Sequence, residues 1–88
     1  MSTKPPSLVQ ASSADSLELL AYSVVSEIPT TEPNDRARLG YCVWAWLSER
    51  RGTLQHAIRA AGTRTTYSTD QMYDVIRKRL EEKGIKIS

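Results

Sequence analysis

Residues 53–87 read TLQHAIRAAGTRTTYSTDQMYDVIRKRLEEKGIKI, and this stretch decides the fold that the sequence predicts. Its first part is a short amphipathic helix over 54–61. Thr53 precedes this helix as an N-cap, because its hydroxyl can accept a hydrogen bond from a free N–H of the first turn. Gly62 is expected to end the helix, because glycine readily adopts the left-handed conformation that ends many helices. The inward face of the helix is expected to hold Leu54, Ala57, Ile58 and Ala61.

A longer helix is expected after the polar turn 63–67. Ser68 and Gln71 have the spacing of a capping box, in which each side chain bonds the backbone N–H of the other residue. Gly84 closes the helix, and Ile85 is placed for the apolar contact of a Schellman motif. The buried stripe consists of Met72, Val75, Ile76 and Leu80. Residues 85–87 alternate apolar and polar side chains and could pair as one short β-strand.

The N-terminal part predicts one further helix, which begins near Asp15 and ends at about Glu27. Asp15 and Glu18 also have capping-box spacing. Pro29 disfavours the helical conformation of the residue before it, so the helix stops there. Its apolar face recurs at helical spacing and consists of Leu17, Leu20, Ala21, Val24, Val25 and Ile28.

The most apolar run of the chain, residues 41–47, lies in an expected helix that starts at Thr31 or Asn34 and runs to Arg51. Gly52 is its expected left-handed terminator. The run is apolar on all sides of a helical projection, which predicts either the central element or part of a subunit interface. A strand is the alternative, because Tyr, Val and Trp favour pleated surfaces. The candidate interface residues are Tyr41, Trp44 and Trp46, with core packing as the alternative for both tryptophans.

The predicted fold is therefore all-α, a small four-helix domain with a helix-turn-helix-like C-terminal half. Residues 1–13 are expected to be a flexible tail and residues 14–88 a single domain, small enough that a homo-oligomer is expected. The longest uninterrupted apolar run has seven residues, whereas a membrane-spanning helix needs about 20. We expect no membrane segment and no secretory signal, and we place the protein in the cytoplasm.

The formal net charge of +2 hides a division of the chain. Residues 1–35 carry one lysine and five carboxylates, whereas residues 36–88 carry eight arginines and three lysines against five carboxylates. Arginine forks suit phosphate oxygens, so the basic half predicts an anionic partner.

Catalysis and metal binding are not expected. Cys42 is the only cysteine, so an internal disulfide and a multi-thiolate zinc site are excluded. It lies in the apolar run, where cysteine usually acts as a small hydrophobic residue. His56 is the only histidine, and no motif links it to Cys42. We expect a non-enzymatic protein with no cofactor.

Residues 54–61 and 68–83, together with the segment 80–85, resemble the second and third helices and the wing entry of winged helix-turn-helix DNA-binding domains. In that family the later helix enters the major groove, where its N-terminal residues face base edges and flanking basic groups hold phosphates. The resemblance implies base contacts for Thr66, Thr69, Gln71 and Tyr73. It implies backbone contacts for Arg59, Arg64, Arg77 and Lys78.

Arg50 and Arg51 complete the candidate nucleic-acid-binding set, because they belong to the same basic half of the chain. Their alternative role is to oppose the dipole at the end of their own helix. The first hypothesis is therefore a small transcription or replication accessory factor that binds DNA as a dimer.

The second hypothesis is a protein-interaction or assembly module, such as a small phage or viral protein that self-associates or binds a host factor. It is motivated by the apolar run and by Asp70, Asp74 and Glu81, which are expected on the exposed face of the last helix. In that case the basic residues would pair with acids on a partner or on another copy.

Overall fold

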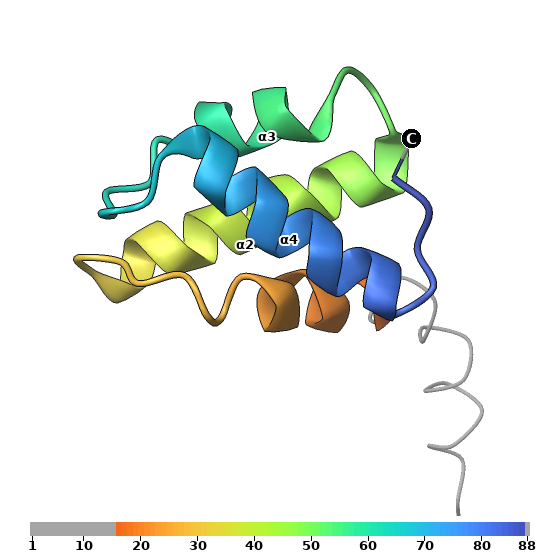
Figure 1. Cartoon of the computed structure of the whole chain (residues 1–88), viewed down its shortest axis with the longest axis horizontal. Coiled ribbons are helices and arrows are strands. Elements are labelled where there is room, and N and C mark those ends of the chain that lie inside the picture. Colours follow the sequence, from red (N-terminus) through yellow and green to blue (C-terminus); the bar gives the residue numbers. More distant parts are fainter. Residues whose placement is uncertain (1–15, 88) are drawn as a thin grey trace, which may run out of the picture.

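The computed structural model describes residues 16–87, which form four helices and no strand. An N-terminal helix over residues 16–24 is followed by α2 (Pro33–Glu49), α3 (Leu54–Ala61) and α4 (Thr69–Glu82) (Figure 1). The predicted all-α, four-helix fold is confirmed. The predicted flexible tail and the capping residue Asp15 lie outside the described residues.

One hydrophobic core joins the four helices. The N-terminal helix and the turn after it contribute Ala21, Val24, Val25 and Ile28, and the helix lies on the side of α2 opposite to α3 (Figure 1). α3 packs against both α2 and α4. The buried hydrophobic residues of the last three helices are Leu39, Val43, Trp46, Leu47, Leu54, Ile58, Ala61, Met72, Ile76 and Leu80.

Both ends of α3 and the start of α4 follow the sequence prediction. Thr53 accepts a hydrogen bond from the backbone N–H of His56 at 3.0 Å, and Gly62 ends α3 with a φ of 61°. At α4 the hydroxyl of Ser68 accepts from the Gln71 N–H at 3.1 Å, while the Gln71 side chain accepts from the Ser68 N–H at 2.7 Å. This reciprocal pair is the predicted capping box.

The C-terminus of α4 is the predicted Schellman motif. The N–H of Ile85 donates to the carbonyl of Leu80, and the N–H of Gly84 donates to the carbonyl of Glu81, both at 2.9 Å. Gly84 has a φ of 87°, which glycine adopts without steric cost. The prediction of a short strand over 85–87 is wrong, because no other segment of residues 16–87 offers it a strand partner.

α2 ends two residues before the predicted position. Arg50 adopts the left-handed conformation, with a φ of 56°, and its N–H donates to the carbonyl of Trp46. The indole Nε1 of Trp46 donates to the carbonyl of Gly52 at 3.2 Å, so this tryptophan holds the loop after the helix. The prediction of Gly52 as terminator is wrong, because α2 already ends at the left-handed residue Arg50. This earlier end leaves the carbonyl of Gly52 beside the buried indole of Trp46.

Two further boundaries differ from those expected. The N-terminal helix ends at residue 24 and tightens into a turn, in which the hydroxyl of Ser26 and its N–H both donate to the carbonyl of Ser23. α2 begins with Pro33, and its N-cap Glu32 makes no side-chain capping bond, so neither Thr31 nor Asn34 is the cap. Proline fits the first helical position, where its missing N–H needs no partner.

The N-terminal helix approaches α2 closely at Gly40. A Cβ atom added to Gly40 would lie 2.3 Å from Cδ1 of the Tyr22 ring, so glycine is the residue that admits this ring. The contact covers one side of α2. It leaves the opposite side, which carries Cys42 and Ala45, to face α3 and solvent.

Candidate interaction surface

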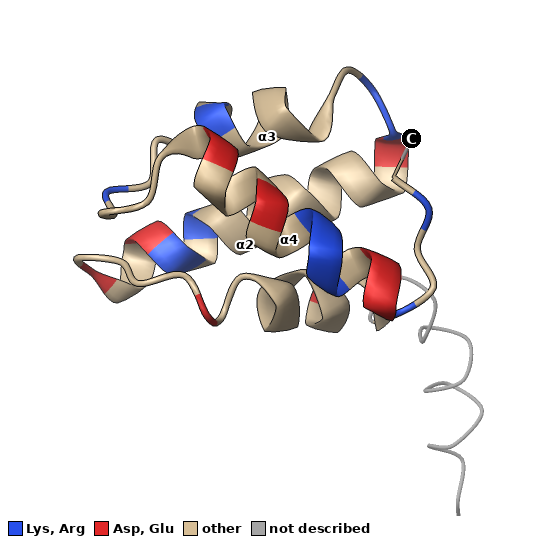
Figure 2. Cartoon of the chain, viewed as in Figure 1, with Lys and Arg blue, Asp and Glu red and all other residues tan. Residues whose placement is uncertain are grey.

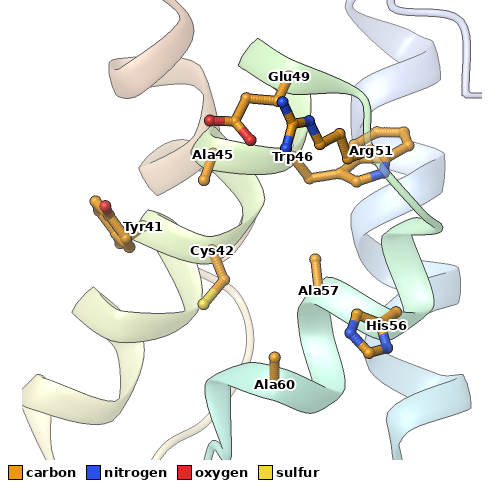
Figure 3. Close-up of a pocket in the computed structure, with 9 residues that line it drawn as sticks. All are labelled: Tyr41, Cys42, Ala45, Trp46, Glu49, Arg51, His56, Ala57 and Ala60. Carbon is orange, nitrogen blue, oxygen red and sulfur yellow. The ribbon is translucent and has the colours of Figure 1, made fainter.

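A shallow apolar groove of about 210 Å³ lies between α2 and α3 (Figure 3). The α2/α3 groove is lined by Tyr41, Cys42, Ala45, Trp46, Glu49, Arg51, His56, Ala57 and Ala60. Cys42 and Ala57 face each other across its middle, while Glu49 and Arg51 lie at one end and Ala60 at the other (Figure 3). Because the small side chains come from both helices, the floor of the groove is apolar and open.

Cys42 is half-buried in this floor. Burial raises the pKa of its thiol above the ordinary value, and the positive charge of Arg38 offsets part of this increase. The thiol is therefore protonated at neutral pH and contributes an apolar, polarisable lining to the groove.

Aromatic side chains extend the apolar surface beyond the groove. Tyr41 is 56% exposed, and its ring lies 5.7 Å from that of Trp44 in a tilted arrangement. Trp44 is half-buried, and its Nε1 is shielded from solvent without a hydrogen-bond acceptor among residues 16–87. Trp46 is only 7% exposed and packs in the core. Of the three candidate interface residues, Tyr41 and Trp44 thus reach the surface and Trp46 supports it from below.

Arg64, a candidate phosphate contact, instead binds carboxylates of its own chain. Its Nε donates to Asp35 at 3.1 Å, and its terminal nitrogen lies 3.4 Å from Glu32. Asp35 is completely buried, and Arg38 approaches it at 3.4 Å. We call Asp35, Glu32, Arg38 and Arg64 the Asp35 network. It fastens the α3–α4 turn to the start of α2, because a buried carboxylate requires cationic partners.

Backbone bonds fasten the same turn further. The N–H of Thr31 donates to the carbonyl of Arg64 at 3.1 Å, and the hydroxyl of Thr65 donates to the carbonyl of Pro29. Thr66, which the resemblance predicted to contact bases, also lies in this turn and is exposed. Arg64 and Thr65, the two residues before Thr66, therefore hold the turn against the loop before α2.

Three of the candidate residues on α4 have partners within the helix or at its cap. Arg77 forms an ion pair with Glu81 at 3.0 Å, and its guanidinium lies 5.9 Å from the centre of the Tyr73 ring. The Gln71 side chain is engaged in the capping box, and Thr69 is half-buried at the first position of α4. The side chains of Arg77, Tyr73 and Gln71 are thus engaged in part in contacts within α4 and its N-cap.

The remaining candidate cations are dispersed. Arg50 lies over the Trp46 ring, 4.7 Å from its centre, after the end of α2. Arg51 follows it in the same loop, whereas Arg59 is on α3 and Lys78 on α4, and all three are exposed. Figure 2 shows Lys and Arg positions at both ends of the molecule and, on α4, a basic band with acidic positions before and after it.

Two functional features were not predicted from the sequence. Asp35 gave no signal beyond an acidic residue in the first turn of a helix, which usually needs no partner except the helix dipole. Ala57 and Ala60 form one wall of the α2/α3 groove, but alanines in a short helix also occur wherever another helix packs.

Comparison of the chain with protein-family models, curated proteins and solved structures found no match. Within residues 16–87 no helix is long and apolar enough to cross a membrane. The part of the chain that the structure describes also contains no group of three metal-ligating side chains.

Proposed function

We propose that this protein is a non-enzymatic interaction module that self-associates through the α2/α3 groove. The observation that carries the proposal is an apolar groove bordered by an exposed aromatic residue, Tyr41, on a small domain. Apolar surface of this kind is stabilised when another molecule displaces the water that covers it. An 88-residue chain also buries a smaller share of its surface than a large domain does, which favours association.

Sedimentation velocity over a wide range of protein concentration tests the proposal. We expect the mean mass to rise with concentration for the wild type. Ala60→Glu should prevent this, because it places a carboxylate in the groove at an exposed helical position where folding tolerates it.

Gln55→Glu is the matched control for this substitution. It adds the same charge to an exposed position of α3, but Gln55 lies outside the α2/α3 groove. A wild type that sediments as a monomer at all concentrations would contradict the proposal, as would equal effects of the two variants.

Nucleic-acid binding is the second candidate function, favoured by the order of α2, α3 and α4 and by the exposed cations Arg59 and Lys78. Fluorescence anisotropy with a random duplex at low and moderate salt tests it. Binding through phosphates should fall steeply with salt, and Arg59→Glu with Lys78→Glu should abolish it. If these reversals leave the binding unchanged, this second function is excluded for the α3–α4 surface.

A further inference from the structure

We infer that the segment that fills the α2/α3 groove is the N-terminal helix of a second copy of the chain, anchored by Leu19. This inference rests on the proposed function and specifies its contact. Leu19 is 71% exposed, and it and Tyr41 are the two exposed large hydrophobic residues of the described part of the chain. One of them borders the groove, and the other lies on a separate helix with no role in the core.

The outward face of the N-terminal helix has the shape that a shallow groove requires. Leu19 is preceded by Ser16 and followed by Ser23 on the same face, and both serines are exposed. Small neighbours let the helix backbone approach the groove closely while the leucine projects. The face is therefore a single apolar knob between small polar residues.

The groove has room for such a knob. A cavity of about 150 Å³ lined by apolar side chains holds benzene, and the α2/α3 groove measures about 210 Å³. Its walls are Ala45, Ala57, Ala60 and Cys42, which present no branched side chain to obstruct an isobutyl group. Tyr41 stands at the edge, where its ring would cover the inserted leucine.

The charges of the two surfaces are complementary. The N-terminal helix over residues 16–24 carries one carboxylate, Glu18, and no cation. At the groove, Arg51 and Glu49 line one end, and Arg38 donates to the carbonyl of Ala61 at the end of α3. Within the chain, Glu27 pairs with Arg79 and Glu32 pairs with Arg64. Glu18 is next to Leu19 and makes no ion pair within residues 16–87, so it can pair with Arg51 or Arg38 of another copy.

A copy cannot fill its own groove. Its N-terminal helix is fixed on the opposite side of α2 by the contact of Tyr22 with Gly40 (Figure 1). Each copy therefore offers one knob and one groove that face different directions. The contact is therefore head-to-tail, and it links successive copies into a chain or, where the rotation between neighbours closes, into a ring.

Two variants and their mixture test the inference. Leu19→Asp removes the knob and leaves the groove intact, and Ala60→Glu does the reverse. We expect each variant alone to associate about tenfold or more weakly than the wild type. An equimolar mixture should associate more strongly than either variant, because one intact knob can enter one intact groove. Thr66→Asp, which adds a carboxylate to the exposed α3–α4 turn, is the control and should behave as the wild type.

Cys42 supplies a second readout that does not depend on mass. It is the only cysteine of the chain and lies in the groove, so its alkylation rate by iodoacetamide reports occupancy. The rate should fall as the wild-type concentration rises and should stay constant for Leu19→Asp.

The outcomes separate the inference from the proposed function. If Ala60→Glu abolishes association but Leu19→Asp associates as the wild type does, another segment fills the groove and only the inference is overturned. If the wild type neither associates nor protects Cys42, both are overturned. If both variants fail alone and the mixture also fails, Leu19 and the groove do not contact each other, and the inference is again overturned.

Discussion

The buried side chain of Asp35 gives Arg64, which is far away in the sequence, a structural role. As an exposed arginine in a polar turn, Arg64 suited a phosphate contact. In the folded chain it partners a completely buried carboxylate, whose isolation in the core would be costly. Because Asp35 and Arg64 are 29 positions apart, no local pattern predicts this pair.

Arg64 and Arg77 should therefore respond differently to removal. Arg64→Ala leaves Asp35 buried with Arg38 as its remaining partner, and we expect it to lower the free energy of unfolding by about 2 kcal/mol. Arg77→Ala removes a surface ion pair on α4 and should cost about 0.5 kcal/mol. Urea denaturation of the two variants measures the difference, and equal losses would contradict a structural role for Arg64.

The thiol of Cys42 gives a prediction about pH. Because burial raises its pKa in the folded state, the folded chain retains this proton at pH values where the unfolded chain loses it. The resulting contribution to stability is fully present below the unfolded pKa and is lost as the pH rises through the folded pKa. Stability at alkaline pH should thus fall less steeply in Cys42→Ala than in the wild type, as urea midpoints measured from pH 7 to 10 would show.

At the scale of the elements, the sequence predicted most where short side chains cap backbone groups. The ends of α3 and both ends of α4 followed from Thr53, Gly62, Ser68 and Gly84, because these residues act on neighbours within a few positions. The end of α2 could not be predicted in this way. It depends on Trp46, whose indole reaches the loop only after the core has placed it.

Gly40 tests the packing between the N-terminal helix and α2. In an isolated helix, Gly40→Ala would stabilise by about 1 kcal/mol. Here the new methyl group would meet the Tyr22 ring, so we expect a net loss of about 1–3 kcal/mol of unfolding free energy. Adding Tyr22→Ala should remove the clash. The double variant should therefore lose less unfolding free energy than the two single variants lose together. A stabilised Gly40→Ala protein would show that the two helices do not approach each other at this point.

At the scale of the whole molecule, the charge division of the sequence is rearranged by folding. The acidic N-terminal part meets the basic part inside the chain, since Glu27 pairs with Arg79 and Glu32 with Arg64. Composition predicted that cations were in excess but not where they would lie. The α2/α3 groove was equally inaccessible to sequence reasoning, because its walls come from two helices whose packing only the fold determines.

Asp70 and Asp74 are exposed on α4, the helix that the nucleic-acid hypothesis places in the major groove. Asp70→Asn with Asp74→Asn raises the formal net charge of +2 by two. Asn34→Lys with Ala37→Lys makes the same change of charge at exposed positions of α2 that lie outside the groove. For an interaction module, we expect the wild type to bind random duplex only weakly, with a Kd of about 10⁻⁴ to 10⁻⁶ M at physiological salt. Both double variants should then strengthen this binding equally, because the attraction depends on net charge alone. If anisotropy titrations show a selective gain for the α4 variant, α4 faces the duplex and the nucleic-acid function is the correct one.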